Sequence, residues 1–191
     1  MKRIQSGLIG TCLCLSMFAG GAGAAEPMAP LATIETLDVP RYMGKWYEVA
    51  KFPNWFQKKC VGETHAEYRQ LDDGRVQVIN RCRLESGEMN EALGVARQVG
   101  PASSPRLEVR FAPAWLSFIP AVWGDYWVID LDSDYSLVAV SEPRREYLWV
   151  LSRTPRVDPQ RYEALRARLA AKGFDLSRLE LTAQGPASQA N

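Results

Sequence analysis

The stretch from Gly44 to Phe52 constrains the fold of this chain more than any other part of the sequence. It reads Gly-Lys-Trp-Tyr-Glu-Val-Ala-Lys-Phe. It is aromatic, prone to form a β-strand, and preceded by Pro40, so it predicts the first strand of a sheet. Gly44 lies two residues before Trp46. A glycine–x–tryptophan pair is weak on its own, because it occurs by chance in many chains.

A second stretch roughly a hundred residues later gives the first one its significance. It runs from Tyr147 to Pro155 and reads Tyr-Leu-Trp-Val-Leu-Ser-Arg-Thr-Pro. Together the two stretches resemble the lipocalins, in which an arginine at the end of the last barrel strand stacks on the tryptophan of the first. The resemblance implies that Arg153 covers Trp46 and joins the first strand to the last. A guanidinium over an indole contributes about 1–2 kcal/mol when partly desolvated.

The resemblance extends over about residues 38–182. Trp-Tyr-Glu-Val-Ala at 46–50 and Gly-Asp-Tyr-Trp-Val at 124–128 resemble the bacterial outer-membrane lipocalins, the plant temperature-induced lipocalins and apolipoprotein D. This resemblance implies an all-β fold: an eight-stranded antiparallel up-and-down barrel with a C-terminal α-helix and a short final strand. It also implies binding of fatty acids, lysophospholipids or other small apolar molecules, in a group linked to membrane maintenance under stress.

The first 24 residues have the composition of a secretory signal peptide. Two basic residues precede an apolar run over 7–18, and small residues follow up to position 24. Cleavage before Ala25 leaves a proline-rich, loose arm over 25–37, the barrel domain over 38–182 and a disordered tail over 183–191. A single transmembrane anchor is the alternative, although the run is shorter than the ~20 apolar residues that a span needs. Export places the protein in the periplasm, and association with the outer membrane is a further hypothesis.

The four cysteines divide between the signal and the barrel domain. Neither Cys12 nor Cys14 follows the small residue that a bacterial lipid anchor requires, so lipidation at these positions is not expected. After cleavage only Cys60 and Cys82 remain, and in an oxidising compartment one disulfide is the natural outcome. Two unpaired buried thiols are the alternative.

The order of elements agrees with the resemblance. We expect eight strands, at about 45–52, 63–71, 75–82, 91–98, 106–111, 124–131, 135–141 and 146–153. Asp158 can cap a helix that has Pro159 at its first position and ends before Gly173. Residues 179–182 read as a last short strand. The segment 112–123 is as apolar as a core, yet its prolines forbid a regular strand or helix interior.

The turn Asp72-Asp73-Gly74 fixes the register of the second and third strands. Three loop residues with glycine last are typical of a hairpin whose third residue is left-handed, so Tyr68 faces Val78 and Ala66 faces Asn80. These four residues then share one face, which is apolar with a few polar atoms, as expected for a lined cavity. The opposite face is charged and must be outside; it holds His65, Glu67, Arg69, Gln77 and Arg81.

The connections of an up-and-down barrel alternate between its two ends. Counting them brings the residues of the family motifs to one end, which we call the closed end: Gly44, Trp46, Asp134, Tyr135 and Arg153. Asp134 and Tyr135 occupy the place of the third motif of the family, with Ser133 where threonine is usual. We expect the closed end to be structural and the opposite end, the mouth, to admit the ligand.

The mouth is expected to carry many apolar side chains. They come from two loops: Trp55 and Phe56 from the first, and Trp115, Leu116, Phe118, Ile119 and Trp123 from the second. A contiguous exposed apolar patch indicates contact with a membrane, a partner or a ligand. The alternative is that these side chains fold inward and seal the mouth.

Glu48 is the one carboxylate expected inside the barrel. It shares the parity of Trp46 and Ala50, and a buried carboxylate needs a partner or becomes protonated. It is either a structural hydrogen-bonding group or an anchor for the polar head of a ligand. The full predicted ligand-binding set is Glu48, Ala50, Ala66, Tyr68, Val78, Asn80, Tyr126 and Trp149.

Little in the sequence indicates catalysis. The hairpin register turns the single histidine, His65, outward, which favours a solvated imidazole over a general base. No closely spaced His or Cys pair outside the signal, and no phosphate-binding or nucleophile-elbow motif, appears in the sequence. We expect no metal and no cofactor. The net charge of +1 gives no reason to expect nucleic-acid binding.

The sequence therefore predicts a periplasmic protein that binds, stores or transports a lipid, either a fatty acid or a lysophospholipid, without covalent chemistry. Peripheral contact with the outer membrane and a homodimer are further hypotheses. One alternative is an isomerase or esterase on the same barrel, which could use Cys60 or Cys82 only as a free thiol. Another is a structural protein that docks on the outer membrane through its mouth and stores no ligand.

Overall fold

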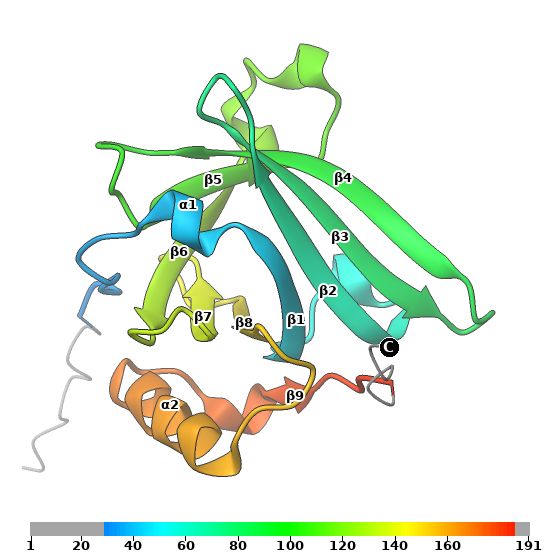
Figure 1. Ribbon diagram of the computed structural model, residues 1–191, viewed down its shortest axis with the longest axis vertical. Helices are drawn as coiled ribbons and strands as arrows, with labels where there is room; N and C mark the ends of the chain where they lie inside the picture. Colours follow the sequence, from blue (N-terminus) through cyan, green and yellow to red (C-terminus); the bar gives the residue numbers. More distant parts are fainter. Residues whose placement is uncertain (1–28, 186–191) are drawn as a thin grey trace, which may run out of the picture.

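The computed structural model describes residues 29–185 and shows a closed antiparallel barrel with one helix packed on its outside (Figure 1). The strands are β1 (Gly44–Lys51), β2 (Cys60–Gln70), β3 (Val76–Leu84), β4 (Met89–Gln98), β5 (Arg106–Arg110), β6 (Gly124–Leu131), β7 (Leu137–Ser141), β8 (Leu148–Ser152) and β9 (Glu180–Leu181). The helices are α1 (Val39–Tyr42) and α2 (Pro159–Ala171), with 3₁₀ turns η1 (Trp55–Gln57), η2 (Ala114–Leu116), η3 (Pro120–Val122) and η4 (Leu176–Arg178). Strands β1 to β8 pair in sequence order and β1 also pairs with β8, so the predicted barrel, helix and final strand are confirmed.

Three predicted features lie outside the described residues: the signal peptide over 1–24, the cysteines Cys12 and Cys14, and positions 186–191 of the tail. Within residues 29–185, none of the helices combines the length and the apolar character needed to cross a membrane.

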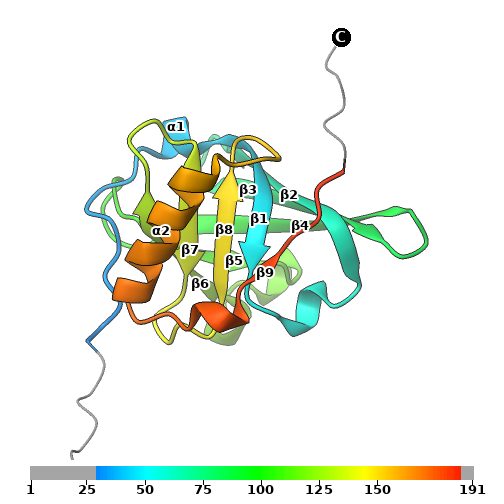
Figure 2. The same ribbon diagram turned by 90° about the horizontal axis from the view of Figure 1, so that it is seen from below.

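Strand β7 is buried on both faces because it separates two hydrophobic cores. Its side chains Val138 and Val140 point into the barrel, while Leu137 and Ala139 pack with Leu165 and Leu169 of α2. Figure 2 shows α2 lying across the outer face of β7 and β8. The predicted N-cap is confirmed, since the Asp158 carboxylate accepts a hydrogen bond from the backbone of the helix's first turn.

The closed end is held by the guanidinium of Arg153. Its Cζ lies 3.9 Å from the ring centroid of Trp46, a side chain that is completely buried. The same guanidinium donates hydrogen bonds to the carbonyl oxygens of Lys45 at 3.0 Å, Arg41 at 2.9 Å and Tyr135 at 3.2 Å. Gly44 is required here because its φ is +94° and a Cβ would lie 3.4 Å from Nη1 of Arg153.

The structure thus brings together four of the five residues predicted for the closed end. The fifth, Asp134, lies in the adjoining turn, but its carboxylate points to α2 and pairs with Arg161 at 3.0 Å. The turn itself is anchored by Tyr135, whose backbone has a φ of 58° and whose hydroxyl accepts a hydrogen bond from the Asp38 amide at 3.1 Å.

The N-terminal arm is ordered against the barrel from residue 29, so the expectation of a loose arm is wrong for this part. Leu31 lies in the core beneath α2, and Leu37 lies in the core of the barrel. The Ile34 amide donates to the carbonyl of Val128 at 3.1 Å, which fixes the path of the arm along β6.

The wall between β1 and β2 is completed by the segment 180–184, which we call the closing segment. Strand β1 pairs with β2 only from Gly44 to Tyr47. Beyond that point the Thr182 amide donates to the Val49 carbonyl at 2.9 Å, and the Ala183 carbonyl accepts from the Glu63 amide at 2.7 Å. The first part of the predicted disordered tail is therefore bound instead, at least as far as Gln184, whose amide donates to carbonyls of both strands. Figure 2 shows β9 beside β1.

The predicted disulfide between Cys60 and Cys82 is confirmed, with the two Cα atoms 5.5 Å apart. Strand β2 begins at Cys60, earlier than expected, and contains two register irregularities before His65. They shift the partner of Cys60 to Leu84, two residues nearer to Cys82 than an unbroken ladder would place it. The bulges are therefore what allows the disulfide to form.

Replacing Arg153 with alanine should lower the free energy of unfolding by about 1–3 kcal/mol, because it removes the cation–π contact and leaves three carbonyls without their donor. Urea denaturation measures this loss. Arg153→Lys keeps the positive charge but loses the planar guanidinium, so its stability should fall between that of the wild type and that of Arg153→Ala. An alanine variant of unchanged stability that no longer binds lipid would reverse the structural role assigned to Arg153.

Replacing both cysteines with serine should cost about 3 kcal/mol, since the disulfide closes a loop between residues 22 positions apart. Urea denaturation with and without reductant measures the effect, and reductant should change the wild type but not the double variant. Finding free thiols at Cys60 and Cys82 in the denatured, unreduced protein would contradict the disulfide.

Candidate ligand-binding site

The hairpin of β2 and β3 forms one inner wall of the barrel, in the predicted register. Ala66 pairs with Asn80 and Tyr68 pairs with Val78. Ala66, Tyr68 and Val78 belong to the buried core of the barrel, whereas Asn80 remains partly exposed. The described residues offer the Asn80 side chain no hydrogen-bond partner, so its amide is free to contact a guest molecule.

The inner wall remains accessible above this core. Several inward-facing side chains are partly exposed, among them Asn80, Ala92, Val109, Tyr126 and Trp149. Ala92 is opposite Asn80 on the same face, in the middle of β4. Part of the exposure of Ala92 comes from the edge of β4, since β5 pairs with β4 only over residues 95–98. The partial exposure of Val109, Tyr126 and Trp149 indicates an inner wall that is not fully covered on the mouth side.

Ala50 does not line this space, so its inclusion in the predicted set is wrong. The pairing of β1 with β8 shifts by one residue between Glu48 and Ala50. This bulge reverses the alternation, and Ala50 packs outside the barrel with Val150 and Leu165, beneath α2.

Three tyrosine hydroxyls meet inside the barrel. The hydroxyl of Tyr126 lies 2.7 Å from that of Tyr42 and 3.0 Å from that of Tyr68. The rings of Tyr42 and Tyr68 stack with centroids 5.7 Å apart, and Tyr42 lies against Trp46. Burial raises the pKa of Tyr68 to about 12 and raises the pKa values of Tyr42 and Tyr126 well above the usual value. All three phenols are therefore neutral at ordinary pH.

Glu48 lies inside the barrel near its mouth, where both of its oxygen atoms are hydrogen-bonded. Oε2 accepts from the Gln57 amide at 2.7 Å, and Oε1 accepts from the Thr182 hydroxyl at 2.5 Å. The Gln57 carbonyl in turn accepts from the indole of Trp149 at 3.0 Å and from the amide of Asn54 at 2.5 Å. These contacts support the structural interpretation of Glu48 over the role of ligand anchor.

The pKa of Glu48 is raised, chiefly because burial disfavours the carboxylate, and the hydrogen bonds from Thr182 and Gln57 only partly oppose this. Neither donor is charged. Glu48 therefore couples the closing segment and η1 to the inside of the barrel through a group whose ionisation is costly.

The aromatic side chains of the mouth are largely exposed, so they do not seal it. Trp55 is 72% exposed, Trp115 71% and Phe118 77%. Phe56 is 44% exposed, and its ring lies 6.1 Å from the ring of Trp149, a residue of the inner wall. Leu116 and Ile119 are half-buried.

Trp123 was expected at the mouth but lies on the outer face of the barrel. Its ring stacks under the guanidinium of Arg97 at 4.1 Å and lies 5.2 Å from that of Arg110. Strand alternation explains this position, because the neighbouring inward positions are Gly124 and Tyr126.

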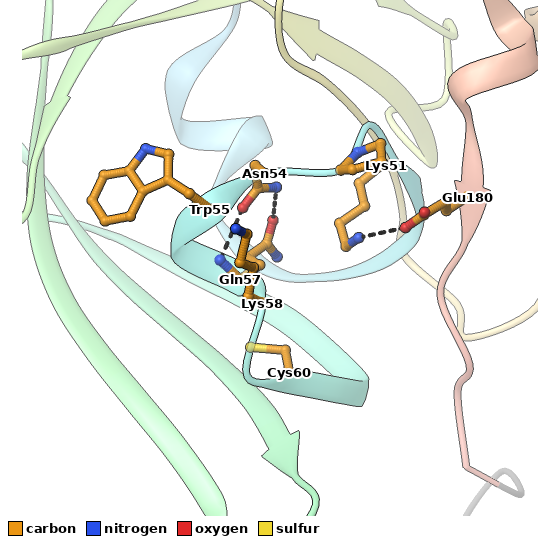
Figure 3. A pocket seen from close by; sticks show the side chains of 8 residues that line it. Lys51, Asn54, Trp55, Gln57, Lys58, Cys60 and Glu180 are labelled. Atoms are coloured by element: carbon orange, nitrogen blue, oxygen red, sulfur yellow. Dashed lines mark hydrogen bonds and ion pairs between the residues drawn. The ribbon is translucent and has the colours of Figure 1, made fainter.

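A groove of about 320 Å³ opens between η1 and β9. Figure 3 shows the Asn54–Gln57 hydrogen bonds on one side of it and the Lys51–Glu180 ion pair on the other. Lys58 also lines the groove, which gives this side of the mouth a basic character.

The two candidate catalytic groups are not arranged for catalysis. His65 lies on the outside of β2, and burial together with the charges of Lys45 and Arg81 lowers its pKa to about 4. The sulfur atoms of Cys60 and Cys82 are bonded to each other, so neither is a free thiol.

The comparison with known proteins agrees with this geometry. A family model described as a lipocalin-like domain matches residues 37–184. The chain belongs to the lipocalin family. This lipocalin is 38% identical over 156 residues to temperature-induced lipocalin-1 of Arabidopsis thaliana, an alignment that covers 81% of this chain and 83% of that one. The predicted resemblance is therefore confirmed.

A bacterial relative and a solved structure extend the comparison. The outer membrane lipoprotein Blc of Vibrio cholerae is 37% identical over 169 residues, which cover 87% of this lipocalin and 92% of Blc. The structure of insecticyanin from the tobacco hornworm Manduca sexta superposes with a TM-score of 0.62. The two chains share 17% identity, and the match covers 82% of this chain and 85% of insecticyanin. At that identity the likeness concerns the fold alone.

Several residues of the site were not predicted from the sequence. Tyr42 lies in the short helix α1 before the first strand, and Thr182 lies in the closing segment. Gln57 lies in the first mouth loop, where only the aromatic residues stood out. The alternation of side chains along the barrel strands does not reach these positions, so it could not predict that they belong to the site.

The raised pKa of Glu48 makes the stability of this lipocalin depend on pH. A carboxyl group whose pKa is higher in the folded than in the unfolded state stabilises the fold below the unfolded pKa, about 4.3, and that contribution is lost as the pH rises through the folded pKa. The free energy of unfolding of the wild type relative to Glu48→Gln should therefore decrease as the pH rises from about 4. Urea denaturation at several pH values measures this difference. Parallel pH profiles would mean that Glu48 titrates normally.

Proposed function

We propose that this lipocalin binds a single-chain lipid, a fatty acid or lysophospholipid, inside its barrel and exchanges it with a membrane of the cell envelope. One observation carries the proposal: an accessible, mostly apolar inner wall opens at an end whose rim exposes large aromatic side chains. Such a combination of an apolar interior and a few placed polar groups is typical of small-molecule sites.

The inner wall suits an acyl chain in size and chemistry. An eight-stranded barrel has room for about one small ligand, and Ala92, Val109 and Trp149 present apolar surface toward the open space. Burial of a chain contributes about 0.8 kcal/mol per methylene. A chain of a dozen carbons can therefore bind well even after the cost of ordering it.

The rim suits a membrane surface. Trp55 and Phe56 project beside Lys58 and Lys59, which are also exposed. Tryptophan prefers the membrane–water interface, and basic residues are attracted to anionic headgroups. A rim of this kind would let a chain pass between membrane and barrel without crossing water.

The relatives support a location in the cell envelope. Blc of Vibrio cholerae is named as an outer membrane lipoprotein. We propose that this lipocalin is exported to the periplasm and contacts the outer membrane through its rim, without a lipid anchor at Cys12 or Cys14. The predicted homodimer stays a prediction.

A tryptophan placed on the inner wall should block the ligand. Ala66 is packed in the core beside Trp46, so substitution there would disturb the fold. Ala92 faces the open part of the interior, and Ala92→Trp should weaken the binding of dodecanoic acid or a lysophospholipid about 10-fold, the cost of excluding roughly two methylenes. Displacement of an apolar fluorescent dye, N-phenyl-1-naphthylamine, measures the affinity.

Leu93→Trp is the matched control, because Leu93 is the next residue of the same strand and is 59% exposed on the outer face. It should bind both lipids as the wild type does. If neither lipid class binds the wild type below about millimolar, or if Ala92→Trp binds equally well, the barrel is not a lipid carrier and the docking alternative is favoured.

A further inference from the structure

The cluster of Tyr42, Tyr68 and Tyr126, which we call the tyrosine trio, has more hydrogen-bond donors than it uses. The three phenols carry three hydroxyl protons. Two hydroxyl–hydroxyl contacts join them, both through Tyr126, and each contact uses one proton. Whichever way the protons are arranged, one remains. Among the described residues, no other group lies within hydrogen-bond distance of these hydroxyls as an acceptor.

Tyr126 is the member of the trio that can present this proton to a guest. Tyr42 and Tyr68 are 2% and 7% exposed, whereas Tyr126 is only partly buried although it points into the barrel. With the hydroxyls of Tyr42 and Tyr68 both donating to it, the Tyr126 oxygen is satisfied as an acceptor. Its own proton is then the one left without an acceptor.

A buried donor without an acceptor is costly, so the trio favours a guest that brings an oxygen to it. The choice of oxygen follows from charge. The raised pKa values keep the phenols neutral, and a single neutral donor does not compensate an ionised carboxylate for the loss of water. A neutral hydroxyl or carbonyl oxygen needs only one such bond.

A second polar group lies on the path to the trio. Asn80 is two residues along β3 from Val78, the partner of Tyr68, so it lies about 7 Å nearer the mouth on the same inner face. A guest that enters from the mouth would therefore meet Asn80 first and Tyr126 at a greater depth.

We propose that the tyrosine trio is a recognition site for one neutral oxygen at the leading end of an otherwise apolar chain, with Tyr126 as the donor. The proposal rests on the proposed function and makes it more specific. The oxygen can come from two sources: a neutral head group that enters first, as in a fatty alcohol, or a hydroxyl at the far end of a fatty acid chain whose carboxylate stays at the mouth.

Three ligands of equal chain length test this site at pH 8: dodecanoic acid, 12-hydroxydodecanoic acid and 1-dodecanol. Their affinities are measured by displacement of N-phenyl-1-naphthylamine from the wild type, from Tyr126→Phe and from Tyr162→Phe. Tyr162 lies on α2, outside the barrel, and is the matched control. Thermal unfolding of each variant checks that the barrel is intact.

In the wild type, a terminal hydroxyl should weaken binding no more than about 3-fold, because Tyr126 replaces the water that the hydroxyl loses. In Tyr126→Phe the hydroxyl of the ligand is buried without a partner. The affinity for 1-dodecanol, for 12-hydroxydodecanoic acid or for both should therefore fall about 10-fold. Dodecanoic acid should bind both proteins alike. The ligand that loses affinity identifies the source of the oxygen.

Equal affinities of wild type and Tyr126→Phe for all three ligands would overturn the recognition site while leaving the carrier function standing. An equal loss for all three ligands, dodecanoic acid included, would also overturn it, since Tyr126 would then only shape the wall. If neither dye nor lipid binds the wild type, the proposed function fails, and the recognition site fails with it.

Discussion

The barrel depends on one guanidinium, because Arg153 joins segments that are far apart in the chain. Its planar group covers the Trp46 ring and satisfies carbonyl oxygens of α1, β1 and the β6–β7 turn. A lysine could supply the charge but not three donors in a plane. This arrangement ties three segments together at the closed end, beside Gly44, whose φ of +94° favours glycine.

At the opposite end, the mouth, the barrel wall is held by hydrogen bonds from segments outside the eight barrel strands. There β1 and β2 diverge, and their backbone groups are satisfied by the backbone of the closing segment and by the side chain of Gln184. The side chains of Gln57 and Thr182 hold the Glu48 carboxylate beside them. The groups that hold this part of the wall are also the groups that surround Glu48. The charge of Glu48, the position of η1 and the position of the closing segment are therefore connected through a few hydrogen bonds.

Local sequence patterns predicted the features whose cause is local. The turn Asp72-Asp73-Gly74 was sufficient for the β2–β3 register, and Asp158 with Pro159 was sufficient for the start of α2. The joining of Trp46 to Arg153 is long-range, and it was accessible only through the resemblance to a family. Once the closed end was known, the alternation of side chains between the two faces of each strand predicted most of the residues of the inner wall.

The failures have a common physical origin. Alternation assumes an unbroken strand, and a bulge after Glu48 turned Ala50 outward, where α2 covers it. Trp123 was assigned to the mouth from its apolar surroundings, but its ring prefers two arginines on the outer face. Tyr42 and Gln57 lie outside regular strands, so their direction is set by tertiary packing.

The closing segment has a consequence for the order in which the molecule can fold. The β1–β2 seam contains backbone bonds to Thr182 and Ala183, which follow α2 in the chain. During synthesis, every barrel strand emerges before these residues do. Until residue 184 has appeared, part of the wall lacks its hydrogen-bond partners, and the interior is open along its side as well as at its mouth. Complete closure is therefore a late event that requires nearly the whole domain, and a chain interrupted after α2 would be left with an unpaired strand edge.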